Sequence, residues 1–163
     1  MEDIRVLAFF YIEQAALMSF IGMGLIGIRL PWKKIMFIGI LQGMVVYLCR
    51  GILYSIYGLP FGTHTLVSFV SLIILFYLIS KQSLGISLTA TAIAFIIEML
   101  SEGIIAPVLY NYISPLSLQT LDDNFWIHIG LSYLSAWLQL LTAAYLALAK
   151  KPLINIEAKK QKV

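Results

Sequence analysis

The chain of 163 residues has little charge for its length. Asp, Glu, Lys and Arg make up 12% of the residues, whereas an ordinary soluble domain carries about 25%. Apolar residues make up 61%, and a soluble fold of this size has too little polar surface to cover so many apolar side chains. The same composition excludes a disordered chain. We therefore expect one domain of an integral membrane protein.

Cysteine is nearly absent, since Cys49 is the single one. One cysteine excludes a disulfide framework within the chain, and a thiol in an apolar run behaves as a small hydrophobic side chain. The N-terminus also lacks the positive start of a secretory signal, because Glu2 and Asp3 precede Arg5. A long apolar run follows, so we interpret the first segment as a retained helix.

Five apolar segments are long enough to cross a hydrocarbon core, which takes about 20 residues of helix. Turns such as Arg29–Lys34 and Lys81–Gly85 separate them, and Pro107 is expected to kink the fourth span or to end its straight part. The fold class is therefore all-α, a polytopic membrane helix bundle in one domain (1–149) with a basic cytoplasmic tail (150–163). The expected spans are 6–28, 35–57, 61–80, 86–106 with an extension to 113, and 126–148.

The longest loop, residues 114–124, has a pattern of its own. Ser114-Pro115 is typical of a helix start, and Leu118, Leu121 and Phe125 share one face of a helix. This pattern predicts a short helix that lies in the membrane interface before the last span. A polar loop with incidental leucines is the alternative.

The distribution of lysine and arginine predicts the orientation. These residues occur in the first and third loops and in the tail, whereas the second and fourth loops have none. Because cytoplasmic loops are enriched in basic residues, we expect the N-terminus outside and the C-terminus in the cytoplasm, as in a multi-pass plasma-membrane protein. The net charge of +3 then reflects a juxtamembrane tail and not a nucleic-acid-binding surface.

Four ionisable side chains lie inside the expected spans, roughly 6–12 Å below the outer surface at 1.5 Å per helical residue. They are Glu13, Arg50, Glu98 and Glu102. His64 lies at the outer mouth of the third span. Ionisable side chains at membrane depth usually face the bundle interior and mark functional sites. We therefore take these five residues as the candidate site.

Two interpretations of this cluster stay open. One is an outward-facing polar pocket for a small signal or peptide, in which Arg50 lies among two or three carboxylates. The other is an intramembrane ion pair that only locks the helices together, with Arg50 paired to Glu98 and to a second carboxylate. Buried charges need partners, and three carboxylates are more than one arginine requires. The pocket also gains a polar extension, because Glu98 and Glu102 share a helix face with Thr91 and Ser87.

The sequence predicts no enzyme, no metal and no cofactor. Cys49 lies in mid-helix and His64 follows a Gly-Leu-Pro break, so the two do not suit the nucleophile and base of a cysteine peptidase. The sequence has no phosphate-binding glycine loop and no hydrolase or zinc-protease motif. Another set of possible ligands has the spacing of no known metal site: His64, His128, Asp122, Asp123 and Glu102.

Gly39 and Gly43 form a small-xxx-small motif, which permits close approach of two helices. The motif serves either packing within the bundle or a homodimer seam, and the sequence leaves both open.

Four stretches together resemble a known family. They are Met1–Glu13, Leu30–Lys34, Gly58–Leu66 and the Glu98-x-x-x-Glu102 pair. They resemble the multi-span membrane input regions of Firmicute sensor histidine kinases of the accessory-gene-regulator type, whose cytoplasmic half is a GHKL-type ATPase. The resemblance implies binding of an extracellular peptide or another small signal. No phospho-acceptor histidine or ATP-binding motif follows the last span, so it also implies a sensor module without its kinase, or a partner of one.

Two functions are therefore expected. The first is a non-catalytic membrane sensor or regulatory protein, and the alternative is a small transporter or the substrate-binding membrane subunit of one. The expected partners are the lipid bilayer, a small-molecule or peptide ligand from outside, and a membrane protein or a second copy of the chain. No nucleic acid is expected.

Overall fold

The computed structural model describes residues 4–53, 63–113, 124–149 and 151–154, with side chains for 4–50, 63–105, 124–149 and 151–154. Over these residues the chain is helical and has no strand. Four helices are long and apolar enough to cross a membrane, and a bent pair near the C-terminus makes a fifth when it is counted as one span. The expected all-α class is confirmed. Five spans were expected, and the described residues contain four helices of spanning length, or five if the bent pair is one span. The interfacial helix predicted for 114–124 falls, apart from Asn124, outside the described residues.

Each helix covers an apolar run found in the sequence. In chain order the elements are α1 (Ile4–Val6), the π-helical η1 (Leu7–Tyr11), α2 (Ile12–Leu25), α3 (Trp32–Tyr47), the π-helical η2 (Leu48–Leu53), α5 (Thr63–Ser80), α6 (Leu84–Ile113), α8 (Phe125–Ser135) and α9 (Trp137–Ala149).

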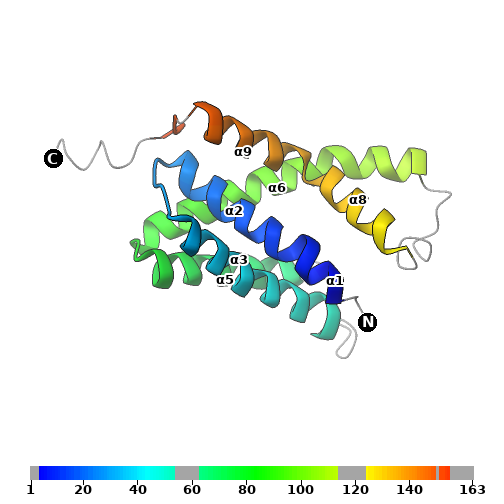
Figure 1. Ribbon diagram of the computed structural model, residues 1–163, viewed down its shortest axis with the longest axis horizontal. Helices are drawn as coiled ribbons and strands as arrows, with labels where there is room; N and C mark the ends of the chain where they lie inside the picture. Colours follow the sequence, from blue (N-terminus) through cyan, green and yellow to red (C-terminus); the bar gives the residue numbers. More distant parts are fainter. Residues whose placement is uncertain (1–3, 54–62, 114–123, 150, 155–163) are drawn as a thin grey trace.

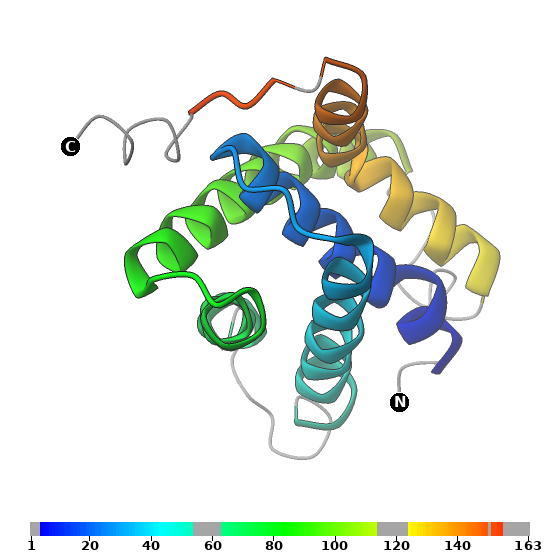
Figure 2. The same cartoon turned by 60° about the vertical axis from the view of Figure 1, so that its left-hand side comes forward.

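Helix α2 lies at the centre of the bundle. It packs against α3, α6 and α9, while α5 packs between α3 and α6 on the side away from α9 (Figures 1 and 2). We call the two ends of the bundle the Arg50 end, with η1, η2, the start of α5 and the start of α8, and the Arg29 end. The Arg29 end holds the α2–α3 and α5–α6 turns and residues 151–154.

The turn after α2 is closed by backbone hydrogen bonds. Ile28 N–H donates to Met23 C=O at 2.9 Å and Gly27 N–H donates to Gly24 C=O at 3.1 Å, the pair of bonds that defines a Schellman cap. Gly27 has a φ of 90°, which favours glycine because it has no Cβ. Pro31 then precedes α3, so the first span ends where the sequence predicts.

Close contacts of glycine hold α2 against its neighbours. A Cβ on Gly39 would lie 2.8 Å from the Cβ of Ala16, and one on Gly43 would lie 2.9 Å from the backbone nitrogen of Ile12. A Cβ on Gly22 would meet the backbone carbonyl of Ala90 on α6. The Gly39–Gly43 motif therefore packs inside the bundle, and its face is not available for a homodimer seam.

The largest apolar core lies in the half of the bundle toward the Arg29 end. It joins α2, α3, α5 and α6 around side chains with 0% exposure, among them Ile26, Ile38, Leu72 and Phe76. A smaller cluster at the Arg50 end is more aromatic and includes Phe10, Tyr11 and Tyr47. The regular, apolar packing is thus concentrated away from the ionisable residues.

Two spans differ in detail from the sequence expectation. Helix α6 is assigned as one α-helix from Leu84 through Pro107 to Ile113, so the helix does not end at Pro107 and includes the expected extension to 113. The segment expected as one helix over 126–148 consists of two helices, α8 and α9, which meet at a bend of 58°. At the bend, Ala136 N–H donates to the carbonyls of both Ser132 and Tyr133. This shared bond ends the regular ladder of α8 before α9 begins.

Candidate functional site at the Arg50 end

Arg50 lies in η2 and contacts η1. Its Nη1 donates to the hydroxyl of Tyr11 at 3.3 Å, and its Cζ lies 5.7 Å from the centre of the Tyr11 ring. Tyr11 is only 2% exposed, so the ring is a fixed platform under an exposed guanidinium. The contact joins the π-helical parts of the first and second spans. Single π-helical turns inside α-helices are rare and occur frequently at functional sites.

Glu98 is held by α2. Gln14 Nε2 donates to Glu98 Oε1 at 3.0 Å, so an amide binds this carboxylate directly. The charge of Arg50 acts on Glu98 and on Glu102 through space, and Glu102 acts on Glu98 in turn. Within the described residues, the direct hydrogen bonds of Arg50 and Glu98 therefore go to Tyr11 and Gln14, while the charges interact at longer range.

Glu13 is tied to the last span. The hydroxyl of Tyr133 on α8 is shared between Glu13 Oε2 and the backbone carbonyl of Phe9, the latter at 2.9 Å. The Tyr133 ring meets Phe10 edge-on, with 5.7 Å between ring centres. Glu13 and Glu102 are exposed on the bundle, whereas Glu98 is half-buried. The three carboxylates therefore remain reachable although each lies on a packed helix.

Ser101, one residue before Glu102, bridges the break in the last span. It is 0% exposed, donates to the backbone carbonyl of Ser135, and accepts from Leu138 N–H at 3.1 Å. One hydroxyl on α6 thus satisfies a carbonyl from α8 and an amide from α9. Buried backbone groups need such partners, above all in lipid. The bend is therefore built into the packing against α6.

The polar face of α6 continues toward the Arg29 end. Ser87 and Thr91 are 0% exposed, and their hydroxyls have no hydrogen-bond partner among the described residues. Gln139 on α9 is 1% exposed, and within the same described part neither atom of its amide has a partner. Unsatisfied polar atoms are costly in a membrane interior. This buried polar file is the feature that a transport function would use.

The remaining predicted residues lie near the same end. His64 is half-buried in the first turn of α5, and Cys49 is buried in η2. In the described part of the chain, no three His, Cys, Asp or Glu side chains gather around one point. Asp122 and Asp123, considered as ligands from the sequence, lie outside it.

The sequence interpretation missed four contributors: Tyr11, Gln14, Tyr133 and Ser101. Gln14 could have been predicted as a contributor from the sequence, because an amide next to Glu13 in an apolar segment requires a hydrogen-bond partner. Ser101 carried a weaker signal, directly before Glu102. Tyr11 and Tyr133 carried none, because their positions depend on the π-helical turn and on the break in the last span.

Comparisons with family models, curated proteins and solved structures give no match for this chain. The interpretation of the site therefore depends on its own chemistry. The described residues of this end hold three carboxylates (Glu13, Glu98 and Glu102) and two guanidiniums (Arg50 and Arg5), and Arg5 lies 4.5 Å from the centre of the Phe125 ring. Tyrosine hydroxyls and a glutamine amide already orient several of the charged groups. Such an arrangement attracts positive charge and can bind it with little reorganisation, because oriented groups do not have to be ordered on binding.

Proposed function

We propose that this chain is a non-catalytic sensor or regulatory protein of the plasma membrane, with five spans, the N-terminus outside and the C-terminus in the cytoplasm. The Arg50 end then faces outward, and its cluster binds a small signal that carries positive charge, such as a basic peptide. The role resembles that of the sensor regions of accessory-gene-regulator kinases, with a membrane protein or a second copy of the chain as the receiver of the signal.

The excess of carboxylates over guanidiniums among the described residues of this end, three against the two of Arg5 and Arg50, is the observation that carries this proposal. Arg50 is engaged by Tyr11, and Glu98 is engaged by an uncharged amide. Glu13 and Glu102 are exposed at the same end of the bundle. In a purely structural ion pair the acid and base would balance, since each uncompensated charge at membrane depth costs free energy. A bound cation compensates the excess.

The aromatic side chains support a cationic ligand as well. Two contacts between a guanidinium and an aromatic ring already occur at this end, with Arg50 at 5.7 Å from the Tyr11 ring centre and Arg5 at 4.5 Å from the Phe125 ring centre. Aromatic faces attract ammonium and guanidinium groups at short range.

A binding experiment with a simple basic peptide tests this function. The protein is placed in phosphatidylcholine nanodiscs and titrated by calorimetry with trilysine amide and with the same peptide acetylated on every amine. We expect saturable binding of the charged peptide only. Glu102→Gln should weaken it about tenfold, the size of one charge-assisted contact, whereas Glu157→Gln, which removes one carboxylate from the tail, should not. Equal affinity for both peptides, or no saturable binding, would refute the proposed ligand class.

A small transporter is the second candidate, and two observations favour it. The last span is broken by 58°, as in transporters whose binding sites use discontinuous helices, and Ser87 and Thr91 form a buried polar file. A transporter must open this file toward the cytoplasm in one state. Cysteine at position 91 in a Cys49→Ser background, in inside-out vesicles, tests for that state. A sensor predicts protection from a thiol reagent, and ligand-dependent labelling would favour transport.

A further inference from the structure

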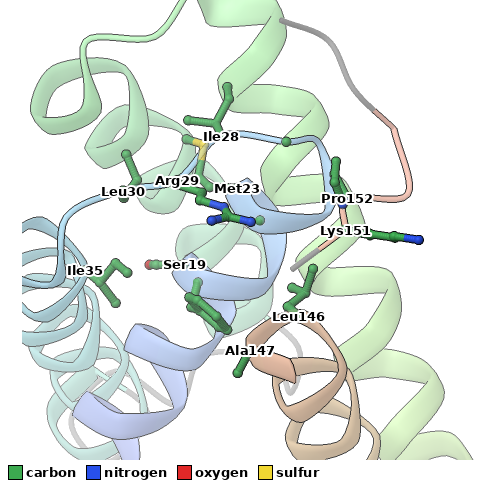
Figure 3. A pocket seen from close by; sticks show the side chains of 13 residues that line it. Ser19, Met23, Ile28, Arg29, Leu30, Ile35, Leu146, Ala147, Lys151 and Pro152 are labelled. Carbon is green, nitrogen blue, oxygen red and sulfur yellow. The ribbon is translucent and has the colours of Figure 1, made fainter. Parts of the chain in front are cut away.

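A cavity of about 340 Å³ lies at the Arg29 end, between the end of α2, the start of α3 and the end of α9 (Figure 3). Apolar groups make most of its wall, including Met23, Ile28 and Leu146. Ser19 is the polar side chain of the wall, and its hydroxyl donates within its own helix to Ala15 C=O at 2.8 Å. The wall therefore suits an apolar occupant.

Two cations stand at the rim of this cavity. Arg29 follows the cap of α2, Lys151 follows α9, and both side chains are exposed. Figure 3 shows the Arg29 guanidinium among the side chains that line the cavity and the Lys151 side chain extending away from them, next to Pro152. The apolar wall suits a hydrocarbon chain and the basic rim suits an anion, so the cavity is complementary to an anionic amphiphile.

The segment after α9 completes the cavity. Lys151 and Pro152 line it, and Ile154 N–H donates to Leu25 C=O at 2.9 Å. The Leu25 carbonyl is one of the groups that the end of α2 leaves without an intrahelical partner. This bond holds the segment 151–154 across the end of the first span and so keeps Lys151 beside the cavity.

We propose that this cavity is a specific site for an anionic phospholipid. The phosphate binds Arg29 and Lys151, and part of an acyl chain occupies the apolar space beside Leu146 and Ala147. The position fits a lipid, because the exposed Trp32 (68%) next to the α2–α3 turn is typical of the membrane interface. Basic pockets between spanning helices on the cytoplasmic side bind anionic head groups. The proposal is independent of the ligand at the Arg50 end.

The first test measures recognition of the charge. Native mass spectrometry and a thermal-shift titration compare phosphatidylglycerol with phosphatidylcholine on the full chain in mild detergent. We expect retention and stabilisation by phosphatidylglycerol. The double change Arg29→Gln and Lys151→Gln should weaken its binding about thirty-fold, since each basic residue near an anionic head group contributes about a fivefold factor. Lys81→Gln removes a cation from the same end but not from the rim, and should leave binding unchanged.

The second test measures occupancy by the acyl chain. Ala147 lines the cavity and is exposed, so Ala147→Phe fills the space with little strain on the bundle. It should abolish phosphatidylglycerol binding at an unchanged melting temperature of the lipid-free protein. Ala144→Phe, on an exposed part of α9 outside the cavity wall, is the control.

Three results would overturn the proposal. The first is phosphatidylglycerol binding that survives the loss of both rim charges. The second is equal binding of phosphatidylcholine, which would remove the role of charge. The third is binding of inorganic phosphate as tight as that of the lipid, which would leave the apolar wall without a function. If Ala147→Phe does not fold, the charge variants still decide between these outcomes.

Discussion

The two ends of this bundle are built by different rules. Toward the Arg29 end, regular α-helices pack through an apolar core, and the first turn has a complete Schellman cap. Toward the Arg50 end, the first two spans become π-helical, the last span bends, and the ionisable residues gather on α2, η2 and α6. Irregular backbone and charge therefore coincide in space.

This difference separates a close-packed half of the bundle from a half that is rich in charge and irregular backbone. In lipid the hydrophobic effect does not drive two helices together, so close packing of small residues is a main source of helix association. At the Arg50 end this close packing is less extensive, and side-chain hydrogen bonds such as those of Ser101 hold backbone groups instead. A region with charges in excess and backbone groups bridged by side chains is suited to a site more than to a scaffold.

The largest expected contrast between the two ends is their accessibility. Helix α5 reaches from one end to the other, since Thr63 begins it and Lys81 follows it. In a Cys49→Ser background, Thr63→Cys should react in whole cells with an impermeant thiol reagent, and Lys81→Cys should react only after lysis. The sides follow from the positive-inside distribution of basic residues. Labelling of the cysteine at position 81 in intact cells would reverse the proposed orientation.

The next contrast is the cost of crowding the glycine contacts. Gly39→Leu places a large side chain where even a Cβ would lie 2.8 Å from Ala16, and should destabilise the bundle by about 3 kcal/mol or more. Gly130→Leu on α8 is the matched control, because no described atom beyond its chain neighbours and its own helix backbone lies within 4 Å of its Cβ position. It should change stability by less than about 1 kcal/mol. The readout is the melting temperature in detergent, and equal losses would show that the α2–α3 approach is not tight.

Removing the bridge at the break should have a smaller effect. Ser101→Ala leaves the Leu138 amide and the Ser135 carbonyl without their partner, and should cost about 1–3 kcal/mol. Ser132→Ala removes a hydroxyl that binds only within its own helix, and should be within about 0.5 kcal/mol of the wild type. Reactivity of a cysteine at position 138 should rise in the first variant alone. An unchanged melting temperature for Ser101→Ala would mean that the bend is held by other contacts.

The smallest effect is expected for the coupling between Arg50 and Glu98. Their charges interact without a direct hydrogen bond, so a double-mutant cycle with Arg50→Gln and Glu98→Gln should give about 0.6 kcal/mol, within the range of polar interactions in membranes. The double variant should be less damaged than the sum of the singles. Glu13 is bound by Tyr133, and a cycle of Arg50→Gln with Glu13→Gln should be additive. If the losses are additive in both cycles, Arg50 and Glu98 have no measurable interaction energy.

Much of the fold was predictable from the sequence because each rule involved was local. The length of the apolar runs predicts the long helices, the turn that contains Pro31 predicts the end of the first one, and Gly39 and Gly43 predict a close contact between two helices. Whether that contact was internal could not be read from the motif, since either partner helix satisfies it. The structure decides it through Ile12 and Ala16 on α2.

The charged residues of the site could be predicted from the sequence, but their hydrogen-bond partners could not. Ionisable residues at membrane depth are conspicuous, and Glu13, Arg50, Glu98 and Glu102 do lie toward one end. Their hydrogen bonds depend on rotations that a sequence does not encode simply. A π-helical turn shifts the face on which Tyr11 lies, and the bend at Ala136 sets the direction of Tyr133. The cavity at the Arg29 end was not foreseen, because a cavity is a gap between three helices.

The most direct test of the central claim, that the Arg50 end binds a cation and is not only a structural ion pair, is the variant Glu98→Gln with Glu102→Gln. Glutamine at position 98 can still accept the bond from Gln14, and Arg50 keeps Tyr11. The account predicts a melting temperature close to that of the wild type, because the acid excess and the repulsion along α6 disappear together, and a loss of trilysine binding of at least about tenfold. A fall in melting temperature of about ten degrees, the size expected when a buried pair loses its partner, together with unchanged trilysine affinity, would contradict it.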